Sequence, residues 1–200
     1  LSIRRQRQMC IRDSCESAKI FSEEYDGKVH VVDNHRISVT MEESVINAIE
    51  YAKEGLSAAE IKERLEKEAY DATIFITVED LNYLKKGGRV TAAAAAIGTI
   101  LNLKPVLTIQ GEKLDAFAKA RTVKQAKSIM IDAMKSDFEK RFNNPDGSQI
   151  NLEMAYTHDI AAAETFKEEV QAAFPNNEIV MNPLSLSVSC HIGPGALAIA

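Results

Sequence analysis

The sequence predicts an α/β protein in two parts: the remnant of a parallel α/β domain, followed by helices on a mostly antiparallel sheet. Three observations predict this fold class. Residues 16–78 alternate helical and β-rich patterns, as parallel α/β units do. Residues 104–121 have the pattern of a β-hairpin with a glycine turn, which pairs strands antiparallel. Apolar residues make up 46% of the 200 residues, enough to bury one large core or two small ones.

Residues 1–14 stand apart from the rest of the chain. They carry four arginines against one aspartate, without helical or strand periodicity, and Met9–Ser14 matches a translated sequencing-library adaptor. We interpret residues 1–14 as non-native, or alternatively as a disordered basic arm, and we exclude them from the fold prediction.

Residues 15–78 are predicted to form a partial N-terminal domain. Its patterns run helix, strand, helix, helix and strand, over residues 16–25, 28–33, 41–53, 57–69 and 72–78. Val45, Ile49 and Ala52 share one face of the second helix. Ser57 and Glu60 have the spacing of a capping box, which predicts the start of the third helix. Residues 72–78 are almost continuously apolar, as expected for a strand covered on both faces at the end of a parallel unit.

Residues 79–200 are predicted to form the C-terminal domain, with the boundary between Val78 and Gly87. After the hairpin, Thr122 is expected to cap a long helix that ends near Arg141. A strand over 150–156, a helix over 160–174 and a strand over 178–181 follow. Residues 184–200 are predicted to form two strands, or a strand and a turn, around Gly193-Pro194-Gly195.

Composition excludes several function classes. The net charge is −5 and the lysines and arginines are scattered, so we expect no nucleic-acid binding. The longest apolar run, Ala92–Leu101, is too short to cross a bilayer, so we expect no transmembrane segment, and no signal peptide is apparent. Cys10, Cys15 and Cys190 lack zinc-like spacing, which favours a reduced cytoplasmic protein with no metal or cofactor.

The segment Asp80–Thr91 holds the first candidate site. Gly87 and Gly88 free the backbone, and Thr91 can cap a helix that begins with five alanines. Arg89 is thereby placed beside a helix N-terminus, where a carboxylate or phosphate is favoured. The segment equally fits a glycine-terminated helix followed by a surface arginine, and local sequence leaves both interpretations open.

Two further features bear on this site. The small side chains of the alanine helix either pack closely on a sheet or leave a narrow apolar channel for an extended hydrocarbon chain. The residues that would line such a channel are Ala92, Ala96, Ile97 and Ile100. His191 precedes Gly193 and Gly195, whose backbone can approach a ligand closely. It is the second candidate for binding an anion, or else a structural histidine at a strand end.

Four segments together resemble the DegV family: Asp80–Thr91, Leu101–Leu107, Ala120–Thr122 and His191–Ala196. The resemblance begins at about Glu16 and implies two α/β domains, with a long-chain acyl tail buried in the C-terminal one. It also implies a non-catalytic, bacterial fatty-acid-binding subunit. An ATP-dependent fatty acid kinase subunit would phosphorylate the bound carboxylate, and the acyl phosphate would enter phospholipid synthesis.

Carried onto this sequence, the resemblance assigns Arg89 and His191 to the fatty-acid carboxylate. Gly87, Gly88, Gly193 and Gly195 would supply backbone to the same site. The family's threonine and serine hydroxyls from the N-terminal region have no counterpart here, so we expect weak acyl binding or none. An enzyme acting on a small anion at Arg89 and His191 is the alternative from another class. A lipid-sensing regulatory module is a third.

Overall fold

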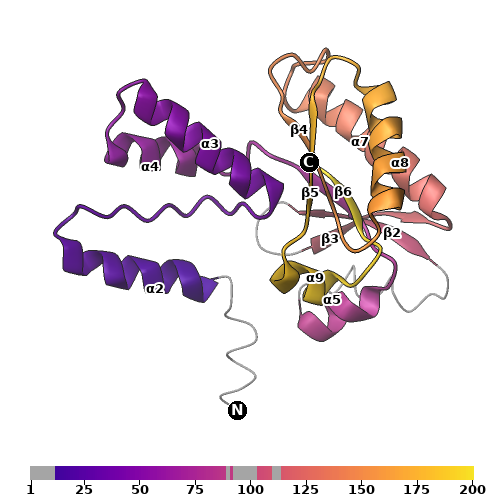
Figure 1. The fold of residues 1–200 in the computed structure, drawn as a ribbon, viewed down its shortest axis with the longest axis horizontal. Helices are drawn as coiled ribbons and strands as arrows, with labels where there is room; N and C mark the ends of the chain where they lie inside the picture. Colours follow the sequence, from indigo (N-terminus) through magenta and orange to yellow (C-terminus); the bar gives the residue numbers. More distant parts are fainter. Residues whose placement is uncertain (1–11, 89–90, 92–102, 110–113) are drawn as a thin grey trace. The chain divides into compact units, whose positions relative to one another are not determined.

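The computed structural model describes residues 12–88, 91, 103–109 and 114–200 (Figure 1). They divide into two compact units. The first comprises Leu1–Ile37 and Met41–Asp71, and the second comprises Ser38–Thr40 and Ala72–Ala200. The division falls at Asp71–Ala72, earlier than the predicted boundary after Val78.

The first unit is helical in its described part. It contains α2 (Arg12–Ser22), the 3-10 helix η1 (Glu23–Tyr25), most of α3 (Val39–Lys53), and α4 (Ala58–Lys67). The capping box that opens α4 is confirmed: the Ser57 amide donates to Glu60 Oε2 at 2.8 Å, and the Glu60 amide donates to Ser57 Oγ at 3.4 Å. Helix α2 starts at Arg12, within residues 1–14, which the sequence analysis excluded from the fold prediction.

The strand predicted at residues 28–33 is wrong. This segment has no strand partner among the described residues and is held instead by side chains of α4. The Lys62 ammonium donates to the carbonyl of Val31 at 2.6 Å, and the Asp33 amide donates to a carboxylate oxygen of Glu66 at 3.1 Å. Side chains therefore satisfy backbone groups that a neighbouring strand would otherwise pair with.

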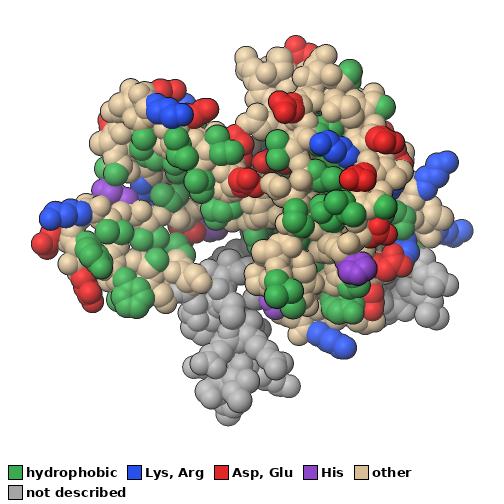
Figure 2. Space-filling model, viewed as in Figure 1, with side chains coloured by type: hydrophobic (Ala, Val, Ile, Leu, Met, Phe, Trp, Pro, Cys, Tyr) green, Lys and Arg blue, Asp and Glu red, His purple; other side chains and the backbone are tan. Residues whose placement is uncertain are grey.

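Helix α3 leaves apolar side chains in solvent. The predicted apolar stripe is present, but Val45 is 55% exposed and Ile49 is 52% exposed. Ile20 and Phe21 of α2 are more than half exposed as well. Hydrophobic side chains accordingly gather on the surface of this unit in Figure 2. Amphipathic periodicity thus identified the helix correctly, but not the exposure of its apolar face.

The second unit is built on a six-stranded sheet in the order β3-β2-β1-β6-β4-β5. Every neighbouring pair is antiparallel except β4 and β5, which are parallel. The strands are β1 (Ile74–Thr77), β2 (Lys104–Ile109), β3 (Leu114–Ala120), β4 (Leu152–Tyr156), β5 (Ile179–Pro183) and β6 (Leu197–Ile199). Its described helices are α5 (Leu81–Gly87), α7 (Val123–Lys140), α8 (Ile160–Ala173) and α9 (Leu186–Ile192). The mixed α/β class with a mostly antiparallel sheet is confirmed.

Strand β1 is a central strand of this sheet and not the end of a parallel unit. All four of its residues are buried, as its apolar run predicted. Its partners β2 and β6 both run antiparallel to it, and β6 lies more than a hundred residues further along the chain. An apolar run indicates that both faces are covered but carries no information about strand direction, which these distant partners decide.

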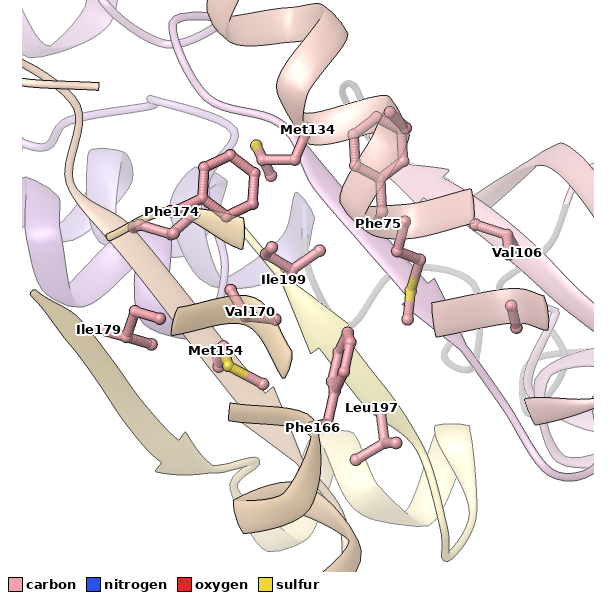
Figure 3. Packing of buried hydrophobic residues seen from close by; sticks show 14 of the residues in the cluster. Phe75, Val106, Met134, Met154, Phe166, Val170, Phe174, Ile179, Leu197 and Ile199 are labelled. Atoms are coloured by element: carbon pink, nitrogen blue, oxygen red, sulfur yellow. The ribbon is translucent and has the colours of Figure 1, made fainter. Parts of the chain in front are cut away.

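Helices α7 and α8 cover one face of the sheet and form the main core (Figures 1 and 3). The N-cap predicted at Thr122 is confirmed, because its hydroxyl accepts from the Gln125 amide at 3.1 Å. The core joins apolar side chains of both helices to alternate residues of the strands, including Phe75, Met134, Met154, Phe166, Val170 and Ile199. Residues between these positions on each strand point to the opposite face.

Candidate functional site

Helix α5 carries the first half of the predicted site. The carboxylate of Asp80 caps it by accepting from the Asn82 amide at 2.8 Å. The helix ends at Gly87, and Gly88 follows with a φ of 66°, the left-handed conformation that glycine adopts without strain. The two glycines therefore end the helix, as the interpretation of this segment as a glycine-terminated helix predicted. Arg89 lies outside the described residues, so its contribution to anion binding stays a prediction.

Thr91 is tied to strand β3. Its amide donates to the Leu114 carbonyl at 3.0 Å, and its hydroxyl donates to Asp115 Oδ1 at 2.6 Å. The hydroxyl bond lowers the pKa of the Asp115 carboxyl, with a further contribution from the Ala116 amide. The proposed channel residues Ala92, Ala96, Ile97 and Ile100 lie outside the described residues.

His191 is in a helix, so the two strands, or strand and turn, predicted for residues 184–200 are wrong over residues 186–192. Helix α9 spans Leu186–Ile192, and its backbone bonds run from the Ser189 amide to the Ser185 carbonyl and from the Gly193 amide to the Ser189 carbonyl, both at 2.8 Å. The alternation of leucine, valine and serine before His191 suggested a strand. A run this short also fits two helical turns, and packing against α5 selects the helix. The strand predicted after the turn is confirmed as β6.

The turn that follows α9, Gly193-Pro194-Gly195, is held by one buried residue, Thr157. The Thr157 hydroxyl donates to the Gly193 carbonyl at 2.7 Å and accepts from the Ala196 amide at 2.9 Å. The Thr157 carbonyl accepts from the Gly195 amide at 3.1 Å. These backbone groups are thus bonded within the protein. The two glycines shape the turn, each with a positive φ.

Helices α5 and α9 lie side by side in Figure 1, and α5 also packs on the turn that follows α9. The ring of Tyr83 on α5 lies directly over Gly193, where an added β-carbon would be 2.6 Å from Cδ2. The two sequence elements singled out as candidates therefore belong to neighbouring helices, although about a hundred residues separate them. Sequence reasoning included Tyr83 in the Asp80–Thr91 segment without giving it a role, and it missed Thr157, which belongs to no polar cluster or spaced motif.

The opposite face of the sheet carries a row of small and branched apolar residues. Ile76 is paired with Leu107 on one side and Ala198 on the other, and Ala198 is paired with Ala155. All four are at most 4% exposed, yet none belongs to the core under α7 and α8. The sheet thus has a second buried apolar surface, and two of its central positions are alanines.

In residues 12–88, 91, 103–109 and 114–200, no group of three histidine, cysteine or acidic side chains is placed to hold a metal ion. In the same residues, no helix is both long and apolar enough to cross a membrane.

The model of the DegV family matches residues 13–200. The chain belongs to the DegV family. Among its curated relatives is a DegV domain-containing protein of Clostridium perfringens, 30% identical over 175 residues. The alignment covers 87% of this chain and 58% of that protein.

Solved DegV structures share the fold. A structure described as fatty acid binding of a DegV family protein from Thermus thermophilus superposes with a TM-score of 0.80 at 31% identity, covering 92% of this chain and 64% of that one. DegV of Bacillus subtilis, described as a fatty acid binding protein, gives a TM-score of 0.68 at 26% identity, covering 86% and 59%. This DegV chain therefore spans about three fifths of the length of these relatives.

Proposed function

We propose that this chain binds a long-chain fatty acid in the bacterial cytoplasm and presents its carboxylate to a separate, ATP-dependent fatty acid kinase subunit. The observation that carries the proposal is the Thermus thermophilus relative, which is 31% identical, shares the fold and is described as fatty acid binding. The chain would act as a carrier without catalysing the transfer itself. Its ligand would then be the fatty acid alone, with no cofactor.

The second buried surface of the sheet supports the position assigned to the acyl tail. Apolar side chains on Ile76 and Leu107 flank the alanines at positions 155 and 198. A methyl side chain leaves depth above the sheet that a larger side chain would fill. Burying an extended hydrocarbon there contributes about 0.8 kcal/mol per CH₂ group removed from water. The predicted channel residues 92, 96, 97 and 100 would form its other wall.

Side chains would supply positive charge for the carboxylate, because the end of α9 does not. His191 lies in the last turn of α9, at the negative end of the helix dipole, which disfavours an anion. A carboxylate placed there needs donors from outside that helix backbone. The guanidinium of Arg89, following the end of α5 at Gly88, provides two parallel N–H groups and a fixed charge. The imidazole of His191 provides one further N–H donor.

The phosphoryl transfer itself calls for a partner. A carboxylate oxygen would attack the γ-phosphorus of ATP, forming the acyl phosphate as the bond to ADP breaks. Such chemistry needs groups that cradle the nucleotide phosphates and its Mg²⁺, and the sequence has no Walker-type loop. We therefore assign nucleotide binding to the kinase subunit and carboxylate presentation to this chain.

Carboxylate selectivity tests the proposal. The protein translated from the complete reading frame, stripped of lipid, is titrated with a long-chain fatty acid and with the alcohol of equal chain length. We expect the acid to bind at least about tenfold more tightly than the alcohol, and Arg89→Ala to abolish that difference and kinase-dependent phosphorylation. Lys86→Ala, on the exposed end of α5, is the matched control and should change neither. Equal binding of acid and alcohol by the unchanged protein would contradict recognition of the carboxylate.

A further inference from the structure

Thr157 makes four hydrogen bonds to one short segment. Besides the two formed by its hydroxyl, its amide donates to the Ala196 carbonyl at 3.1 Å and its carbonyl accepts from the Gly195 amide at 3.1 Å. The residue is 3% exposed. It follows strand β4, whereas its partners lie between α9 and β6. One buried side chain thereby fixes both ends of the Gly193–Ala196 turn.

The turn is also packed from the opposite side. The ring of Tyr83 covers Gly193, and the Glu79 side chain lies near Gly195, 3.4 Å from where a β-carbon on Gly195 would be. Glu79 in turn forms an ion pair with Lys104 at the start of β2. The turn therefore has little freedom to move while the Thr157 hydroxyl is present. His191 precedes Gly193 by two residues, so a displacement of the turn would displace its imidazole.

We infer that Thr157 is the positioning residue of the turn that follows His191, and that its hydroxyl sets the imidazole where a carboxylate is recognised. This inference rests on the proposed function, because carboxylate recognition is the property that it adjusts. The physical reason is the paired use of the hydroxyl. It donates to the Gly193 carbonyl and accepts from the Ala196 amide, so removing it leaves two buried backbone groups without partners. The backbone bonds of Thr157 go to the Gly195 amide and the Ala196 carbonyl, so they do not satisfy the two groups that the hydroxyl binds.

Three variants separate the hydroxyl from the shape of the side chain. Thr157→Val keeps the shape and removes the hydroxyl, while Thr157→Ser keeps the hydroxyl. Thr165→Val is the matched control, because Thr165 is exposed on α8 and its hydroxyl donates to the Ala161 carbonyl of its own helix. If the valine variant does not fold, Thr157→Ala takes its place with the same expectations.

The test titrates the protein from the complete reading frame with the fatty acid and with the alcohol of the same length. We expect Thr157→Val to weaken binding of the acid about tenfold and binding of the alcohol less than about twofold, with Thr157→Ser and Thr165→Val close to the unchanged protein. A merely structural threonine would weaken both ligands equally. That result, or no change for either ligand, would overturn the inference.

Amide hydrogen exchange and the His191 ring resonances provide a readout without ligand. In Thr157→Val, the Ala196 amide should exchange about tenfold faster and the His191 ring signals should shift. In Thr157→Ser both should match the unchanged protein. If the unchanged protein binds neither ligand, the proposed function fails, and exchange alone decides whether Thr157 positions the turn. Identical exchange and ring signals in the valine and unchanged proteins would overturn it.

Discussion

The aromatic ring of Tyr83 covers the α-carbon of Gly193, so that a β-carbon at that position would lie 2.6 Å from Cδ2 of the ring. Gly193 also has a φ of 85° and a ψ of 174°, a backbone conformation that only glycine adopts readily. This contact joins the helix that precedes Arg89 to the turn that follows His191. A side chain at position 193 is therefore disfavoured for two separate reasons: it would strain the backbone, and it would clash with the Tyr83 ring.

These two reasons predict that Gly193→Ala destabilises the protein more than Gly195→Ala. Both glycines have positive φ, but a β-carbon on Gly195 meets only Glu79, at 3.4 Å. We expect a loss of unfolding free energy of about 2–5 kcal/mol for Gly193→Ala and about 1–2 kcal/mol for Gly195→Ala. Urea denaturation measures both. Replacing Tyr83 with alanine in the Gly193→Ala protein should recover part of its loss, and equal losses for the two glycines would contradict the packing argument.

Thr77→Val is expected to stabilise the second unit. Thr77 is 2% exposed, and its hydroxyl oxygen has no hydrogen-bond partner within the part of the chain that the structure describes. It lies on the α7 and α8 face of β1, where valine has nearly the same shape. Removing the unsatisfied group should raise the unfolding free energy by about 1 kcal/mol. Thr77→Ser keeps the hydroxyl and should gain nothing, and a destabilised valine variant would mean that the hydroxyl is satisfied after all.

The bond between Thr91 and Asp115 predicts an acid-sensitive contact. The Thr91 hydroxyl, and then the Ala116 amide, lower the pKa of the Asp115 carboxyl from its ordinary value of 3.8. A carboxyl with a lowered folded-state pKa stabilises the fold above the unfolded-state pKa and loses this contribution as pH falls through its folded-state value. The stabilising contribution should therefore be complete above about pH 4, decline below it, and be lost once pH has fallen through the lowered folded-state pKa.

Carbon-detected NMR titration of the Asp115 carboxyl measures this pKa. Thr91→Val should raise it towards 3.8, since the largest cause of the shift is removed. Asp146, whose pKa is lowered by Ser148, provides an internal reference that the substitution should leave unchanged. An Asp115 pKa that does not respond to Thr91→Val would show that the hydroxyl bond is absent in solution.

The core prediction concerns Phe166 on α8, which is fully buried among strand side chains (Figure 3). Phe166→Ala should lower the unfolding free energy by about 3–5 kcal/mol, because it removes buried apolar surface and leaves a cavity. Ile160→Ala on the same helix is the control, since Ile160 is 53% exposed and should cost less than about 1 kcal/mol. Similar losses at the two positions, measured by thermal unfolding, would contradict the assignment of this core.

Local sequence signals predicted local structure well. The Ser57–Glu60 capping box, the Thr122 cap and the burial of β1 each depend on residues within one turn or one strand, and the structure has all three. Strand direction depends on partners far along the chain, so the antiparallel pairing of β1 could not be read from its own residues. The short run before His191 fits a strand or a helix equally well, and its packing on α5 decides between them.

The glycines and the histidine of the candidate site could be predicted from the sequence, because local signals identify them. Gly88 after α5, His191 on α9 and Gly193 after α9 stand out by residue type. The sequence therefore indicated both helices of the candidate site. Thr157 could not be found in this way, because a lone threonine after a strand has no local signature. Its importance comes from two hydrogen bonds to a segment 36 and 39 residues away.

Organic extraction of the purified protein from the complete reading frame, followed by mass spectrometry, tests the central claim most directly. If the chain is a fatty-acid carrier, the extract should contain a long-chain fatty acid in a molar ratio near one, and lipid-stripped protein should take up added fatty acid to the same ratio. An extract without fatty acid, from a folded protein that also takes up none when it is supplied, would contradict the claim.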